Sequence, residues 1–98
     1  MNYRNKKLLE ACRKLPCQIC GIDDGTVCAA HSNQIIHGKG VSIKASDAMV
    51  AALCNVCHFA IDSGKAFGKD ERKDFWNMAH QKTMRELIER EILIIKVK

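Results

Sequence analysis

The fold is decided by the stretch Cys54-Asn-Val-Cys57-His58, which has a counterpart in Cys17-Gln-Ile-Cys20 near the start of the chain. Two residues between the cysteines of a pair allow both sulfurs to reach one metal ion across a tight turn. Four thiolates then complete the tetrahedron that Zn²⁺ prefers. The sequence therefore predicts one structural zinc ion held by both pairs, with residues 21–53 inserted between them.

The composition is that of a small basic protein. The chain has 98 residues, which predicts one domain over 1–98, and its 16 Lys and Arg against 11 Asp and Glu give a formal charge of +5. This balance suits a polyanionic partner such as nucleic acid. No signal-peptide pattern follows Met1, and the longest apolar runs, 48–54 and 92–95, are too short to span a bilayer. We therefore expect a cytoplasmic protein with no membrane partner.

The compartment also bears on how the six cysteines are interpreted. A disulfide framework is disfavoured where thiols stay reduced, and a redox Cys-x-x-Cys needs no second pair. Ordinary core cysteines are the remaining alternative to zinc. Cys12 and Cys28 lie outside the two pairs, and both are interpreted as core thiols.

Hydrophobic periodicity and helix-breaking residues predict an α+β protein. Pro16 ends the first helical pattern, Gly64 stops the second, and residues 32–46 form a polar loop or irregular hairpin. The expected elements are helices at 4–15, about 54–62 and 69–90, and strands at 26–31 and 49–53. Residues 92–97 either continue the last helix or form a terminal strand, and the strand is favoured.

Two histidines flank the insertion between the cysteine pairs. His58 directly follows the second pair, and Asp62 lies one helical turn later, so the two side chains either bind a divalent metal or hydrogen-bond to each other. His31 ends the strand that enters the insertion, where a neutral imidazole could take a proton from water. We interpret His31 and His58 as catalytic candidates and assign no role to His37 or His80.

The order of these residues resembles that of a known family. It resembles the HNH (His-Me finger) endonucleases with a treble-clef zinc site, most closely the prophage-encoded YbcO-like nucleases. The matching segments lie between about residues 9 and 64: the two cysteine pairs, Ala30-His31, Gly38-Lys39-Gly40, Lys44-Ala-Ser-Asp47 and His58-Phe-Ala-Ile-Asp62. The resemblance implies a zinc and ββα-metal core at about 17–64, in which a hairpin from about 27 to 53 is crossed by the next helix. Helices precede and follow this core.

The resemblance also implies an activity, the metal-dependent hydrolysis of phosphodiester bonds in DNA. His31 matches the general base, and Asp47 is the best match for the middle residue, which fixes the hairpin and orients the base. His58 matches a ligand of the catalytic divalent metal, which would be Mg²⁺, Mn²⁺ or Zn²⁺, with Asp62 as a second candidate ligand.

Other positions in the sequence bear on metal binding, on DNA binding and on the oligomeric state. Many HNH enzymes carry an acidic residue or histidine directly before the base, where this chain has Ala30. Lys39 and Lys44 are expected to contact DNA phosphates, with a solvated loop as the alternative. A strand at 92–97 could pair across a homodimer, although the sequence does not decide the oligomeric state. The rival functions are a non-catalytic zinc-stapled DNA-binding module and a phage interaction protein, neither of which needs both His31 and His58.

Overall fold

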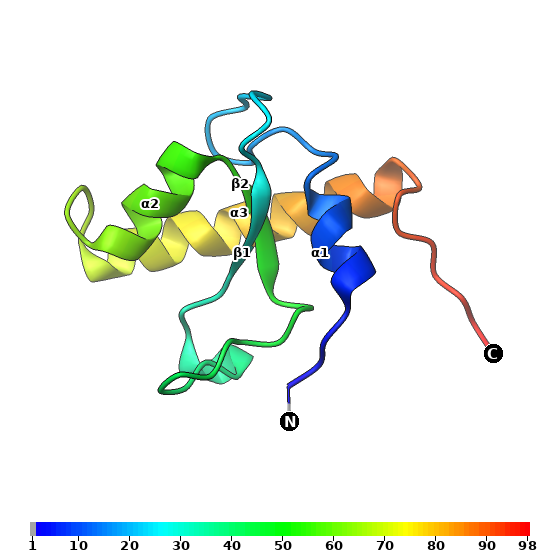
Figure 1. The fold of residues 1–98 in the computed structure, drawn as a ribbon, viewed down its shortest axis with the longest axis horizontal. Helices are drawn as coiled ribbons and strands as arrows, with labels where there is room; N and C mark the ends of the chain where they lie inside the picture. The colour runs from blue at the N-terminus through cyan, green and yellow to red at the C-terminus, as the bar shows by residue number, and fades with distance from the viewer. Residues whose placement is uncertain (1) are drawn as a thin grey trace.

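The strands and helices of the chain are arranged around one short antiparallel hairpin (Figure 1). The structure, a computed structural model, describes residues 2–98. Along the chain the elements are α1 (Lys6–Cys12), β1 (Cys28–His31), the 3₁₀ helix η1 (Ile35–His37), β2 (Val50–Leu53), α2 (Asn55–Ser63) and α3 (Lys69–Glu89). The predicted α+β class is confirmed.

The register of the hairpin places His31 at its open end. Cys28 lies opposite Leu53 at one end of the ladder, and His31 lies opposite Val50 at the other. Residues 32–49 therefore leave and return at the same end, and Figure 1 shows them below the strands. The strands predicted at 26–31 and 49–53 are confirmed, each slightly shorter than expected.

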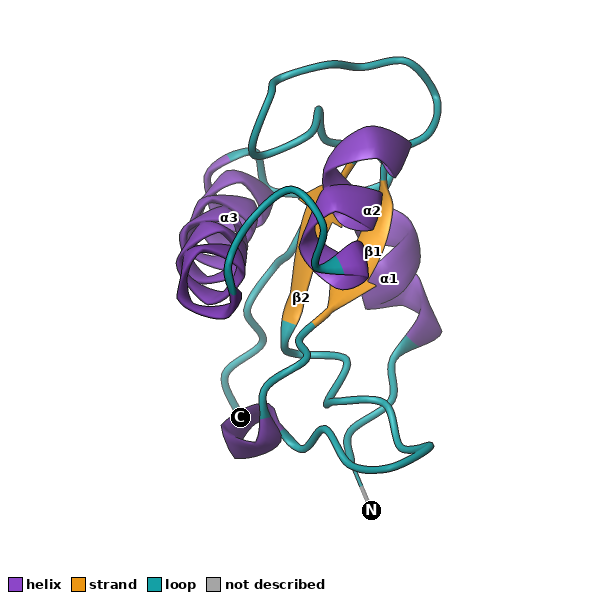
Figure 2. Cartoon of the chain, turned by 90° about the vertical axis from the view of Figure 1, so that its left-hand side faces the viewer, coloured by secondary structure: helices purple, strands orange, loops and turns teal. Residues whose placement is uncertain are grey.

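Helices cover the hairpin on several sides. α3 packs mainly against β2 and α1 mainly against β1, and Figure 2 shows these two helices on opposite sides of the hairpin with α2 in front. All four residues of β2 are buried as a result. Strands covered on both faces read as continuous apolar runs rather than as alternating patterns, which explains the run at 48–54.

Side chains of α3 hydrogen-bond to the backbone of the hairpin. The hydroxyl of Thr83 accepts the Ala52 N–H at 2.9 Å and donates to the Ala79 carbonyl at 2.7 Å. The indole N–H of Trp76 donates to the Ala30 carbonyl at 3.0 Å. Because buried polar groups need partners, these bonds hold α3 at one position along the strands.

α1 is shorter than the helix predicted at 4–15. It begins after Asn5, whose side-chain oxygen accepts the Leu8 N–H at 3.1 Å, and it passes into tighter turns after Cys12. Cys12 and Leu15 are both buried, so the prediction that Cys12 is a core thiol is confirmed. Burial raises the pKa of this thiol to about 11, which keeps it protonated and inert.

α2 and α3 match their predictions closely. Gly64 follows α2 in the left-handed region with φ 72°, a conformation that glycine adopts without strain. α3 begins after Gly68, whose N–H donates to the Glu71 carboxylate at 3.1 Å. The loop between the strands contains η1 and one isolated bridge from Gly40 to Ile43, in keeping with an irregular hairpin.

The strand predicted at 92–97 is wrong. The N–H groups of Ile92 and Leu93 both donate to the Leu87 carbonyl and close the end of α3, and the residues after them have no strand partner within 2–98. The expected pairing of this segment across a homodimer therefore loses its basis, and dimerisation stays a prediction. No helix in the described part of the chain is long and apolar enough to cross a membrane.

Candidate functional site

The four paired cysteines converge on one point. The sulfurs of Cys17, Cys20, Cys54 and Cys57 all lie within 4.8 Å of one another, and Cys20 Sγ lies 3.7 Å from Cys54 Sγ. A tetrahedral zinc site with bonds of about 2.3 Å places its sulfurs about 3.8 Å apart. The cluster therefore has the donor set and the spacing of a structural zinc site.

The first cysteine pair lies in a tight turn that is fixed to the sheet. The Cys17 N–H donates to the Ile22 carbonyl and the Gly21 N–H to the Cys17 carbonyl, each at 2.9 Å. Gly21 has φ 80°, which a residue with a Cβ adopts only with strain. The Gln18 N–H donates to the Ala52 carbonyl at 2.9 Å, so the turn is fastened to the outer edge of β2.

The second pair opens α2. Cys54 is the N-cap residue, and its sulfur accepts the Cys57 N–H at 3.5 Å. For Cys17, hydrogen bonds from backbone N–H groups outweigh burial and lower the thiol pKa to about 6. Burial and the neighbouring sulfurs raise the pKa of Cys57 instead. Four sulfurs this close resist ionising together, and a divalent cation is what would stabilise all four as thiolates.

His31 and Asp47 form a close side-chain pair at the open end of the hairpin. His31 Nε2 lies 2.7 Å from Asp47 Oδ1, and their side chains are 18% and 4% exposed. Asp47 also accepts the Asn5 N–H at 2.7 Å and lies 3.2 Å from the Arg4 guanidinium. Although burial alone would raise the pKa of Asp47, these hydrogen bonds and charges hold it below its usual value.

The contact with Asp47 determines which nitrogen of the His31 imidazole is available to accept a proton. With a proton on Nε2 donated to Asp47, the lone pair of Nδ1 is free, and Nδ1 has no hydrogen-bond partner within residues 2–98. A carboxylate held in this way fixes the tautomer and stabilises the imidazolium that forms when Nδ1 takes a proton. The arrangement is therefore chemically competent for general-base catalysis.

A second imidazole–carboxylate pair lies on α2. His58 Nε2 lies 3.0 Å from Asp62 Oδ2, one helical turn away, and His58 Nδ1 lies 3.5 Å from the sulfur of Cys28. The hydrogen bond to Asp62 raises the pKa of His58 and lowers that of Asp62. Cys28 is only half-buried, so its interpretation as a core thiol is wrong. Its position beside His58 was not predicted.

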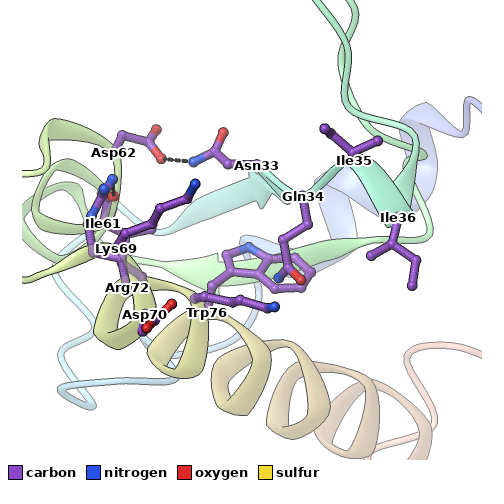
Figure 3. Close-up of a pocket in the computed structure, with 11 residues that line it drawn as sticks. Asn33, Gln34, Ile35, Ile36, Ile61, Asp62, Lys69, Asp70, Arg72 and Trp76 are labelled. Atoms are coloured by element: carbon purple, nitrogen blue, oxygen red, sulfur yellow. Dashed lines mark hydrogen bonds between the residues drawn. The ribbon is translucent and has the colours of Figure 1, made fainter.

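Asn33, in the loop after β1, joins this second pair at the edge of a cleft. Its side-chain amide donates to Asp62 Oδ1 at 2.8 Å, and the two residues line a cavity of about 970 Å³ (Figure 3). The far wall carries cationic side chains from the first turns of α3, and Figure 3 shows Lys69 extending toward the same space. These cations were missed, although their spacing at Lys69, Arg72 and Lys73 is that of one helix face.

Lys39 and Lys44 lie on the loop between the two strands. The side chain of Lys44 is exposed and that of Lys39 is half-buried, and neither forms an ion pair within the described residues. The Lys44 carbonyl accepts from the side chains of Asn2 and Arg4, each at 2.9 Å, so the N-terminal segment holds the loop. Their contact with phosphate stays a prediction.

The predicted site residues thus fall into three groups. The structure brings together the four cysteines, the pair His31–Asp47 and the pair His58–Asp62. Within residues 2–98 no hydrogen bond or ion pair links the second group to the third. No known protein family, curated protein or solved structure matches the chain.

Proposed function

We propose that this chain is an HNH-type endonuclease that hydrolyses DNA with a divalent metal ion. One observation carries the proposal: a histidine ending a β-strand is held by a buried carboxylate, and a second histidine–carboxylate pair lies on the helix that follows the last cysteine pair. A purely structural zinc domain has no need of either pair.

The zinc-binding part is proposed to be a treble clef within a ββα-metal core. Support comes from the order of the elements, since one cysteine pair lies in a turn, the hairpin follows, and the second pair opens a helix. The resemblance to prophage-encoded YbcO-like nucleases rests on the same order, and a phage origin is part of this proposal.

In the proposed reaction His31 acts as the general base. Its Nδ1 takes a proton from water as the water oxygen bonds to phosphorus, and the bond from phosphorus to the leaving sugar oxygen breaks. The leaving oxygen is then protonated from solvent. Asp47 keeps Nε2 protonated and offsets the positive charge that develops on His31.

His58 and Asp62 are the residues that would hold the catalytic metal ion, which would be Mg²⁺, Mn²⁺ or Zn²⁺. A cation bound there supplies positive charge to the scissile phosphate and to the leaving oxygen. The pair fits such an ion because an imidazole nitrogen and a carboxylate oxygen are ordinary ligands for it.

DNA is the proposed substrate because the chain is cationic where the site opens. The formal charge is +5, and Lys69, Arg72 and Lys73 line the cleft that also contains Asp62. Cations that neutralise phosphates bind a polynucleotide without reading its sequence.

The test is cleavage of supercoiled plasmid by the zinc-loaded protein with Mg²⁺, Mn²⁺ or added Zn²⁺. His31→Ala is expected to lower the rate about 10² to 10⁴-fold, since it removes the base from the chemical step. Zinc content and thermal unfolding should not change. Gln81→Ala, which removes an exposed side chain from α3, is the control and should cut normally. If His31→Ala cuts at the wild-type rate, a non-catalytic zinc-stapled DNA-binding module becomes the better description.

A further inference from the structure

The residue before the proposed base does not face the site where a metal would bind. The side chain of Ala30 is 1% exposed in the core, and its carbonyl accepts the indole N–H of Trp76. A metal-binding side chain at this position would be buried among apolar groups, where an unpaired charge is costly. A third protein ligand beside His58 and Asp62 would therefore come from another position.

Asn33 is the residue that occupies the required place. It is exposed, it follows β1 directly after the buried Ser32, and its amide lies 2.8 Å from Asp62 Oδ1. The other oxygen of Asp62 lies 3.0 Å from His58 Nε2. The side chains of Asn33 and His58, from two separate segments, thus both contact the Asp62 carboxylate, and Figure 3 shows Asn33 and Asp62 pointing toward each other at the edge of the cleft.

The spacing of His58 and Asp62 is compatible with neighbouring ligands of an octahedral ion. Neighbouring ligands of Mg²⁺ at about 2.1 Å lie about 3.0 Å apart, which is the separation of His58 Nε2 and Asp62 Oδ2. A half-turn of the Asn33 side-chain amide exchanges its nitrogen for its oxygen, which is an acceptable ligand for Mg²⁺ or Mn²⁺. Amide and carboxylate oxygens with one imidazole favour these hard ions over a thiophilic one.

We propose that Asn33 is the third protein ligand of the divalent metal ion held by His58 and Asp62. It replaces the ligand that many HNH enzymes carry at the position of Ala30. This inference rests on the proposed function for the identity of the metal site. Binding itself is a separate property that needs no substrate.

The experiment titrates zinc-loaded protein with Mn²⁺ and measures free Mn²⁺ by electron paramagnetic resonance. Mn²⁺ is the probe because it is the weakest competitor among the first-row ions for the thiolate site, so the zinc ion stays in place. Asn33→Ala is expected to weaken Mn²⁺ binding about 10-fold or more. Asn33→Asp should bind at least as tightly as wild type, because it supplies a carboxylate oxygen at the same position. Gln81→Ala, which removes an exposed amide from α3, is the control and should bind normally.

Three results would overturn the inference: wild-type protein that binds no Mn²⁺, Asn33→Ala that binds it as tightly as wild type, or Asn33→Asp that binds no better than Asn33→Ala. Each variant is checked for zinc content and thermal unfolding before titration. Plasmid cleavage is scored separately, so the two proposals fail independently. Asn33-dependent Mn²⁺ binding without cleavage would reject the nuclease and keep the metal site, whereas cleavage with Asn33-independent binding would do the reverse.

Discussion

Asp47 is the residue at which three distant parts of the chain meet. Its carboxylate accepts from the Asn5 N–H and lies beside His31 and Arg4, while its own N–H donates to the Tyr3 carbonyl at 2.9 Å. A buried carboxylate with this many partners both stabilises the fold and orients the imidazole.

Asp47→Asn separates these two roles. The amide keeps the shape but loses the charge, so we expect a loss of about 2 kcal/mol in the free energy of unfolding at pH 7. We also expect plasmid cleavage to fall well beyond what the folded fraction explains, because His31 loses its fixed tautomer. Denaturant titration and the cleavage rate, measured on the same preparation, test this. Normal cleavage by a destabilised variant would mean that Asp47 serves the fold alone.

At this scale the sequence predicted that the four paired cysteines meet and that His58 can contact Asp62, because spacing in the chain decides which of these side chains can meet. Asp47 was found only through a family resemblance, since nothing local marks a carboxylate that contacts residues about forty positions away. Asn33 was missed because an exposed amide after a strand carries no pattern of its own. Cys28 was misjudged because the half-buried contact with His58 depends on how α2 crosses the hairpin.

Among the elements, α3 contributes both to the core and to the cleft. One face buries Trp76, Ala79, Thr83 and Leu87 against the hairpin, and its first turns carry Lys69, Arg72 and Lys73 into the cleft. Arg72 donates to the Ile61 carbonyl at 3.1 Å and so also fixes the end of α2. The two lysines make no ion pair within the described residues, which leaves them free to meet phosphate.

The double variant Lys69→Ala/Lys73→Ala should therefore bind DNA more weakly, and about equally across sequences. Each lost phosphate contact lowers the slope of log K against log salt by roughly one, so a decrease of about two is expected. The parallel double variant Lys39→Ala/Lys44→Ala tests the lysines predicted from the sequence in the same way. Fluorescence anisotropy in a His31→Ala background measures binding without cleavage. An unchanged slope would mean that the pair concerned lies in solvated surface.

The helices were easier to predict than the strands. The ends of α2 and α3 are marked in the sequence by cap residues and glycines, and their buried faces by apolar periodicity. All of these signals lie within or next to the helix itself. A strand exists only where a partner is available, which is why the β-branched run at 92–97 misled: within residues 2–98 no strand lies beside it. The second strand of the hairpin was easier to predict than the first, because it is an apolar run that ends directly before Cys54.

For the molecule as a whole, the zinc site is expected to decide whether the chain folds. A domain of this length has a small core, and structural zinc contributes about 10–16 kcal/mol of apparent binding free energy, comparable with the entire stability of such a domain. Chelation, or Cys17→Ser/Cys20→Ser, should therefore abolish the cooperative thermal transition. Elemental analysis should find one zinc per chain, and Cys28→Ser should keep it. A metal-free chain that melts cooperatively at the same temperature would contradict this prediction.

The position of the cysteine pairs on either side of the hairpin also bears on the order of events during folding. Residues 21–53 separate the two pairs, so strand pairing in a metal-free chain must first close a long and flexible loop at an entropic cost. A zinc ion that binds both pairs early would close that loop before any strand forms, and it would bring the two strands of the hairpin close together. If the cluster binds zinc as expected, zinc supply would govern how fast the native state is reached during synthesis, and a chain released into zinc-poor surroundings would spend longer with its apolar strands exposed to aggregation.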